Sequence, residues 1–308
     1  MVSTDNVAPI SPKQWQSRGK LEILMGNSIF VVDEGDVSLP TIVLLHGFPT
    51  SSWDWLPIWD QLAKKYRLIA LDMLGFGFSD KPNNRSYTIH GQADIVEALV
   101  KIKGLKSFHV LAHDYGDTVA QELLARQLEK SGQGTWLSCC FLNGGLFPET
   151  HRALLTQKLL LSPLGRFLNA LTGFAKFSHN FSSVFGVQTK PSEQELEHFW
   201  WLININDGKH IFHNLITYMR DRLEHRARWV SALQQSTISL AVINGSVDPV
   251  SGAHMVARYK ALKCRLDYLA ELPLIGHYPQ VEAPDEVVAH YETYLKSLPD
   301  RSAIVNDD

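Results

Sequence analysis

The stretch from Phe108 to Asp117 restricts the possible folds more than any other part of the chain. Residues 108–112 are apolar enough for a buried strand, and a helical pattern begins at Asp117, so little chain remains for a turn. A strand that passes this abruptly into a helix places the corner residue in a strained conformation, with its side chain above the sheet and beside the helix N-terminus. That residue is Asp114, and we interpret its carboxylate as a nucleophile.

Strands and helices alternate along most of the sequence. Apolar runs predict a hairpin at residues 21–33 and strands at 41–45, 68–71, 108–112, 136–142, 238–243 and 266–272. Helical spacing predicts helices at 51–65, 87–102, 117–129, 252–262 and 284–298. This alternation is typical of a mostly parallel sheet covered by helices on both faces. It breaks at Phe147, where a helical, aromatic-rich segment begins, so we expect an α/β core in two parts, 1–146 and 233–308, with a helical cap at 147–232.

Composition excludes several classes of protein. The apolar fraction of 45% and charged fraction of 20% are those of a globular chain, and the net charge of −3 gives no reason to expect nucleic acid as a partner. Three cysteines are too few for a disulfide framework. We find no signal peptide and no apolar stretch of the roughly 18 residues that a transmembrane segment needs. We therefore expect a cytoplasmic monomer or homodimer.

Two further residues at strand ends complete a possible catalytic set. Asp248 follows the first strand after the insertion, and His277 follows the last strand. A nucleophile needs a base and a group that orients this base, and the order nucleophile, acid, histidine matches one known arrangement. An oxyanion hole would come from the backbone N–H groups of Phe48 and Tyr115. The chain has no Gly-x-Ser-x-Gly motif, which disfavours a serine esterase.

Several motifs carry a resemblance to a known family. They are His46-Gly47-Phe48-Pro49, Leu74-Gly75-Phe76-Gly77-Phe78-Ser79-Asp80, His113-Asp114-Tyr115-Gly116 and His277-Tyr278-Pro279-Gln280. In these the chain resembles the Asp-nucleophile branch of the α/β-hydrolase fold, the epoxide hydrolases and haloalkane dehalogenases. The resemblance implies an eight-stranded sheet and an inserted cap. It also implies a two-step reaction, in which Asp114 forms an alkyl ester that water, activated by His277 with Asp248, then hydrolyses.

The leaving group separates the alternatives. In the resemblance, Tyr218 matches one of the two cap tyrosines that protonate an epoxide oxygen, but it is the only tyrosine between Phe147 and Trp229. A halide site would need Trp200 or Trp201. We expect an epoxide hydrolase-like enzyme acting on a small apolar molecule, with haloalkane dehalogenase as the alternative and a catalytically silent binding or regulatory protein as the third hypothesis.

Simpler interpretations remain for single residues. Tyr218 could be an aromatic side chain that only packs inside the cap. Asp117 departs from the epoxide hydrolase pattern; we interpret it as a carboxylate near a helix N-terminus, although it could also raise the pKa of Asp114. His210 and His213 have helical spacing but no third ligand nearby, so we expect no metal and no cofactor.

Overall fold

Eight strands form a single sheet in the computed structural model, which describes residues 11–152, 155–162, 165 and 172–299. Residues 1–10 and 300–308, at the two ends of the expected core, lie outside the described residues. The strand order is β1-β2-β4-β3-β5-β6-β7-β8. The bounds are β1 Gly19–Leu24, β2 Asn27–Glu34, β3 Thr41–Leu45, β4 Arg67–Leu71, β5 Ser107–His113, β6 Thr135–Leu142, β7 Ser239–Gly245 and β8 Tyr268–Leu272. Only the pairings of β2 with β1 and β4 are antiparallel, so the predicted mostly parallel sheet is confirmed.

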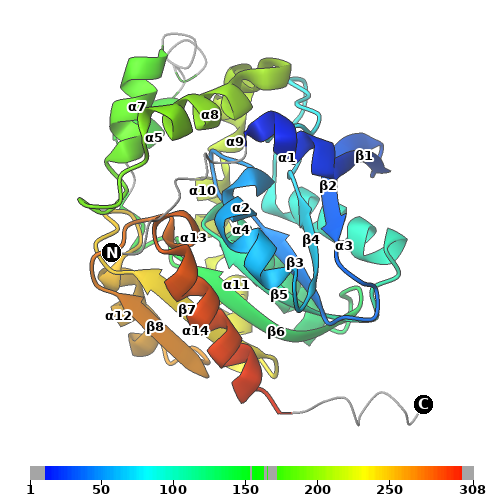
Figure 1. Cartoon of the computed structure of the whole chain (residues 1–308). Helices are drawn as coiled ribbons and strands as arrows, with labels where there is room; N and C mark the ends of the chain where they lie inside the picture. The colour runs from blue at the N-terminus through cyan, green and yellow to red at the C-terminus, as the bar shows by residue number, and fades with distance from the viewer. Residues whose placement is uncertain (1–10, 153–154, 163–164, 166–171, 300–308) are drawn as a thin grey trace, which may run out of the picture.

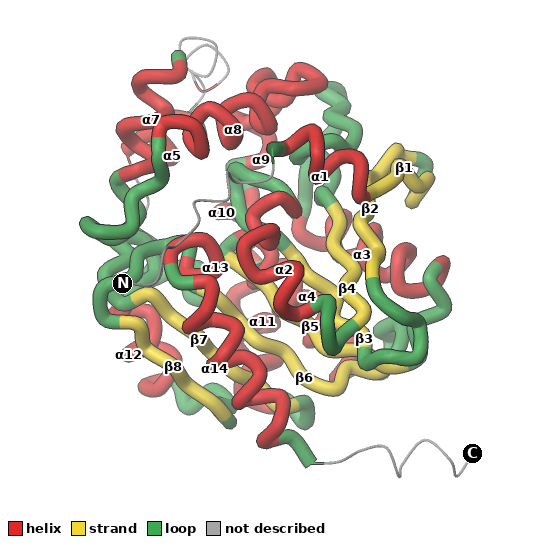
Figure 2. Tube along the Cα trace, viewed as in Figure 1, coloured by secondary structure: helices red, strands yellow, loops and turns green. Residues whose placement is uncertain are grey.

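Helices cover both faces of this sheet (Figures 1 and 2). One face carries α1 (Pro12–Arg18), α2 (Leu56–Leu62) and α14 (Pro284–Ser297), whose apolar side chains join one core cluster. The other face carries α3 (Ile89–Ile102), α4 (Tyr115–Leu128), α11 (Arg226–Gln235) and α12 (Ala253–Ala261), which contribute to the second cluster. Two covered faces explain why the central strands read as continuous apolar runs rather than as alternating ones.

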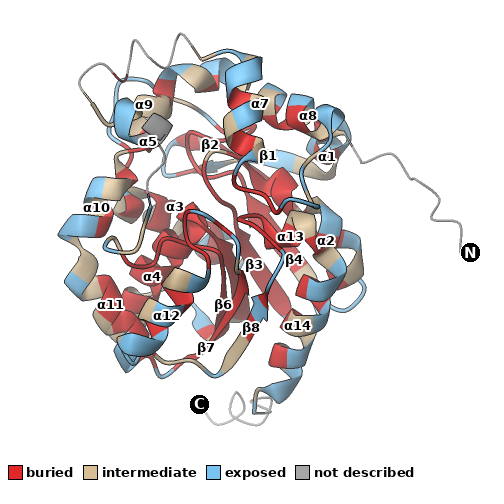
Figure 3. Ribbon diagram, turned by 90° about the vertical axis from the view of Figure 1, so that its left-hand side faces the viewer, coloured by how far each residue is buried: buried red, intermediate tan, exposed pale blue. Residues whose placement is uncertain are grey.

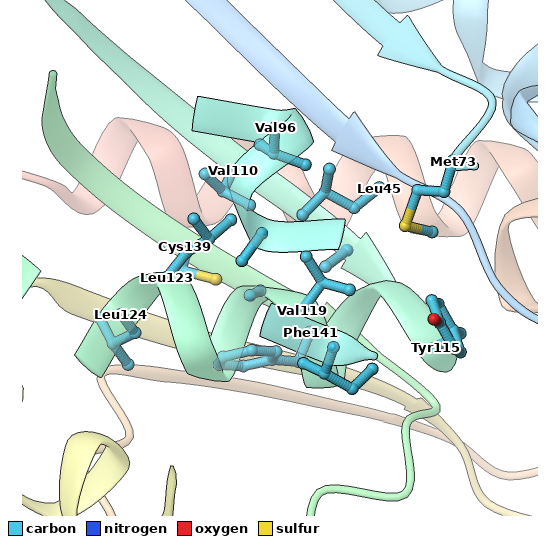
Figure 4. Packing of buried hydrophobic residues seen from close by; sticks show 14 of the residues in the cluster. Leu45, Met73, Val96, Val110, Tyr115, Val119, Leu123, Leu124, Cys139 and Phe141 are labelled. Atoms are coloured by element: carbon cyan, nitrogen blue, oxygen red, sulfur yellow. The ribbon is translucent and has the colours of Figure 1, made fainter. Parts of the chain in front are cut away.

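The central strands are almost completely buried. Every residue of β3 and β7, and all of β5 except Ser107, is buried, and Figure 3 shows the strands as a buried layer between helices with exposed outer surfaces. Figure 4 shows Val119 and Leu123 of α4 beside Val110 of β5 and Cys139 of β6. Burying each large aliphatic side chain stabilises the fold by about 1.5–3 kcal/mol. This packing fixes where β5 ends and where α4 begins.

We infer that most of the segment between β6 and β7 forms the expected cap. Its described helices are α5 (Leu155–Leu160), α7 (Phe174–Ser182), α8 (Glu193–Asn204), η2 (Ile205–Ile211), α9 (Phe212–Leu215) and α10 (Tyr218–Glu224), and α5, α7 and α8 rise above the sheet in Figure 1. The next helix, α11, packs against α4 of the core, where the Trp229 indole donates to Glu122 over 2.9 Å. We infer that the cap ends before α11, so the expected boundary at residue 232 falls inside a core helix.

Two expected helices differ in detail from the observed ones. The predicted helix at 51–65 is a 3-10 turn, η1 (Ser52–Trp55), followed by the short helix α2. The helix predicted from Asp117 begins two residues earlier, at Tyr115, because the chain becomes helical directly after the strained residue Asp114. Within the described part of the chain, no helix has the length and hydropathy to cross a membrane.

Candidate active site

Asp114 occupies a sharp strand-to-helix turn. It lies between β5 and α4 with φ 44° and ψ −99°, a conformation that costs a non-glycine residue roughly 1–3 kcal/mol. The surrounding backbone holds it there, since the Gly116 N–H donates to the His46 carbonyl over 3.0 Å. A side chain at Gly116 would meet the Leu45 carbonyl oxygen at 2.2 Å. The helix can therefore approach the neighbouring strand only because this residue is glycine, and the predicted elbow is present.

His277 and Asp248 come together as the sequence predicts. The His277 Nδ1 lies 2.7 Å from Asp248 Oδ2, so the imidazole donates this hydrogen bond. The other ring nitrogen, Nε2, lies 3.9 Å from Asp114 Oδ2. That separation exceeds a direct hydrogen bond and is one at which a water molecule can intervene. The three side chains, each 5% exposed or less, thus form a connected set at one end of the sheet.

Asp248 is fixed by a dense set of donors. Its Oδ1 accepts from the Val250 N–H, and its Oδ2 accepts from the Asn143 amide and from the N–H and hydroxyl of Ser251. Burial alone would raise the pKa of Asp248, but His277 and these donors outweigh it and lower the pKa. Asp248 therefore remains an anion that orients the imidazole.

The charges on Asp114 and His277 depend on each other. Burial would raise the pKa of Asp114, but His277 and the Arg222 guanidinium outweigh it and hold the pKa well below its usual range. Burial would likewise lower the pKa of His277, yet Asp248 and Asp114 raise it to about 10. In the resting protein at neutral pH, Asp114 is thus an anion and His277 an imidazolium.

The expected oxyanion donors lie beside the carboxylate. The Phe48 N–H donates to Asp114 Oδ2 over 3.1 Å. Tyr115 is the first residue of α4, so its N–H has no acceptor within the helix and is available at the same turn. His113 ties the turn to the histidine loop, because its Nε2 lies 2.7 Å from the His277 carbonyl oxygen.

A largely apolar cavity of about 150 Å³ lies above Asp114. Its floor is formed by Asp114, His277, Phe48 and Tyr278 of the core. The cap side is mostly apolar, with Leu159, Leu160, Phe177, Phe181, Val184, Trp200 and Phe212. Its polar residues are Thr172, Lys176, Asn180 and Lys209. A small molecule with a mainly apolar body fits such a lining.

The two predicted leaving-group residues have different positions. Trp200 lines the cavity. Tyr218 does not: it is fully buried, and its ring packs against Phe48 and Tyr115, with ring centroids 5.9 and 5.0 Å away. In this conformation Tyr218 packs behind Phe48, a residue of the cavity floor, and its hydroxyl does not face the cavity.

Asp117 differs from its expected role. Its side chain is fully buried, and this burial, together with the charge of Asp114, raises its pKa well above the usual value. Both effects favour the protonated form of Asp117 over a carboxylate paired with the helix dipole. The negative charge of Asp114 thus raises the pKa of Asp117, whereas the pKa of Asp114 itself is lowered.

The sequence did not point to two residues that contact the catalytic set. Asn143 donates its side-chain amide to Asp248. Arg222 of α10 lies with its Nη2 3.5 Å from Asp114 Oδ1. Nothing distinguishes Arg222 from the other arginines of the cap in the sequence, since only the fold directs it inward. His210 and His213 do not join a metal site: among the described residues no cluster of three or more His, Cys, Asp or Glu side chains could hold an ion.

Comparisons with known proteins agree with this geometry. The family model for the alpha/beta hydrolase fold matches residues 40–284. The mesoderm-specific transcript homolog protein of Bos taurus is 46% identical over 92% of this chain and 88% of its own length, and the putative hydrolase LipZ of Mycobacterium tuberculosis is 34% identical over 94% and 99%. Among solved structures, the haloalkane dehalogenase DbeA of Bradyrhizobium elkani has a TM-score of 0.76 at 21% identity, covering 91% of this chain and 98% of that one. With its sheet, its elbow and these relatives, the chain belongs to the α/β-hydrolase family.

Proposed function

We propose that this hydrolase acts on a small apolar molecule through a covalent ester on Asp114. The observation that carries the proposal is the joint position of Asp114 and His277 on the floor of an apolar cavity, with the Phe48 N–H already on the carboxylate. Because the elbow residue is a carboxylate, its ester with an alkyl group can be hydrolysed at the enzyme's own side chain. A serine nucleophile cannot follow this route.

In the first step the Asp114 carboxylate attacks an sp3 carbon of the substrate. A bond forms between a carboxylate oxygen and this carbon, and the bond from the carbon to the leaving atom breaks, with its electron pair passing to that atom. The low pKa of Asp114 keeps the nucleophile ionised at neutral pH.

In the second step water attacks the Cγ carbon of the ester, and His277 Nε2 accepts its proton. The resting imidazolium cannot accept a proton, but alkylation replaces the Asp114 anion with a neutral ester. One of the two charges that raise the pKa of His277 is then lost, so the imidazole releases its proton more readily. The first half-reaction thereby prepares the base for the second, while Asp248 holds the ring in place.

Epoxide ring opening is our first choice for the leaving group. Tyr218 does not line the cavity, so an epoxide oxygen would receive its proton from another cap group. The donors on that wall are Thr172, Lys176, Asn180, Trp200 and Lys209. Haloalkane dehalogenation is the second candidate, because the Trp200 indole lines the cavity and an indole N–H can donate to a halide. Haloalkane dehalogenases also share the fold.

Trapping the intermediate tests the proposal. Replacing His277 with Gln removes the base of the second step, so incubation with panels of epoxides and haloalkanes should leave an alkyl group on Asp114, detected by intact and peptide mass spectrometry. An Asp114→Asn variant is the matched control and should gain no mass, once deamidation has been excluded. No adduct with any member of either panel would refute the enzymatic proposal and favour a silent binding protein.

A further inference from the structure

Arg222 reaches from the cap into the catalytic elbow. It belongs to α10, yet its side chain is only 2% exposed. Its Nε donates to the Thr118 hydroxyl over 2.8 Å, and its Nη2 donates to the Asp114 carbonyl over 3.2 Å. The same Nη2 lies 3.5 Å from Asp114 Oδ1, and the guanidinium stacks 4.5 Å from the centre of the Tyr218 ring. A cation from the cap is thus held against the nucleophile.

Asp114 is the anion that balances this buried charge. Asp117 lies in the same turn of α4, but its burial and the charge of Asp114 raise its pKa and so disfavour a second anion there. Asp221, the neighbour of Arg222 on α10, uses its carboxylate to accept from the Ile89 N–H. A buried cation without an anion is strongly unfavourable. Alkylation of Asp114 would therefore leave Arg222 unbalanced until negative charge returns to the carboxyl group.

Negative charge returns during ester hydrolysis. The Phe48 N–H contacts Oδ2 and Arg222 lies at Oδ1, so whichever oxygen forms the ester, the other faces a donor. When water attacks Cγ, the C=O electron pair moves onto this oxygen and the water proton passes to His277. The bond from Cγ to the alkyl-bearing oxygen then breaks, and the departing alkoxide takes that proton. The carboxylic acid that remains on Asp114 then gives the second water proton to His277. The tetrahedral oxyanion and the restored carboxylate therefore both form next to the guanidinium.

We propose that Arg222 stabilises the charge that develops on Asp114 during ester hydrolysis, as a cationic third member of the oxyanion site. This role rests on the proposed function. It predicts opposite effects on the two half-reactions. Arg222 stabilises the Asp114 anion before it attacks, so it does not assist alkylation, whereas it stabilises the transition state of hydrolysis. A residue that only tied the cap to the core would affect both half-reactions in the same direction.

Single-turnover kinetics separate these possibilities. An alkylating substrate found with the His277→Gln protein is mixed with the wild type and with Arg222→Gln, and formation and decay of the alkyl-enzyme are followed by quench-flow and intact mass spectrometry. We expect decay to slow by roughly 100-fold in Arg222→Gln, at the lower end of the loss caused by removing an oxyanion donor, while formation is unchanged or faster. The ester should accumulate. Arg220→Gln is the matched control, because Arg220 is on the same helix, is exposed and contacts the Leu161 carbonyl instead.

Two variants keep the test decisive if Arg222→Gln does not fold. Arg222→Lys keeps a cation and should slow decay less, and Thr118→Val removes the hydroxyl that receives the Nε bond and should also slow decay without slowing formation. Equal slowing of both half-reactions, or unchanged decay, would overturn the role of Arg222 while leaving the proposed function intact. Absence of any adduct in His277→Gln would instead overturn the proposed function, and this role with it.

Discussion

The protonation of His277 predicts a pH dependence of stability that can be measured without a substrate. Burial alone would lower the pKa of His277, but Asp248 and Asp114 raise it from 6.5 to about 10. The folded protein therefore binds this proton more tightly than the unfolded chain does. The stabilisation is complete below pH 6.5 and is lost as the pH rises towards 10. At 1.36 kcal/mol per pKa unit, its upper limit is about 5 kcal/mol.

The loss of this stabilisation with pH should be steepest between pH 7 and 9. One proton allows a slope of at most about 1.4 kcal/mol per pH unit, so the free energy of unfolding should fall by roughly 2–3 kcal/mol over this range relative to His277→Gln. The difference between the two proteins removes the contribution of buried groups that do not interact with His277, such as Lys81.

Urea unfolding at half-unit steps from pH 6.5 to 9.5 measures this difference. His179→Gln is the matched control, since His179 is exposed on α7, and its curve should follow the wild type. Asp114→Asn removes one of the two anions and should reduce the slope in part. The difference in unfolding free energy between the wild type and His277→Gln should therefore shrink with pH. If it is constant or grows, the two carboxylates do not hold a proton on His277.

Three further substitutions test the elbow and its surroundings. Gly116→Ala should destabilise the fold by about 2 kcal/mol or more in urea titrations, because the new methyl group would lie 2.2 Å from the Leu45 carbonyl oxygen. The control Gly173→Ala, where no atom lies within 4 Å, should not be destabilised. Equal stabilities of the two variants would contradict the close approach. Asp117→Asn should raise the melting temperature at pH 8 more than at pH 5, because a buried acid with a raised pKa loses stability as the pH rises; a lower melting temperature at both pH values would show that Asp117 is a needed anion. Tyr218→Phe should change the rate of Asp114 alkylation by less than about threefold, since its hydroxyl does not face the cavity; a large loss would restore Tyr218 as the proton donor.

The three candidate site residues could be located in the sequence because each lies just after a predicted strand. Asp114 directly follows the buried strand β5, and Asp248 follows the buried strand β7. His277 lies in the loop after β8, which is only partly buried. Since parallel strands bring their carboxyl ends to one edge of the sheet, their order along the chain was sufficient to predict that they meet. The prediction of the sheet itself relied on the same periodicity.

The cap was less predictable because its helices carry apolar residues on several sides. Tyr218 and Trp200 are both aromatic residues of helical segments, yet one packs behind Phe48 and the other lines the cavity. Periodicity does not distinguish a side chain packed between helices from one facing a ligand, because both environments are apolar.

The sequence by itself determined the order of strands and helices, the elbow at Asp114 and the two residues, Asp248 and His277, that meet it, because backbone preference and apolar periodicity act between residues close in the chain. Only the tertiary structure decided the electrostatics. It placed Arg222 of the cap beside Asp114, raised the pKa of Asp117 by burying it, and set two carboxylates around His277. Electrostatic energy depends on distance and on exclusion of water, and folding sets both for residues that lie more than a hundred positions apart.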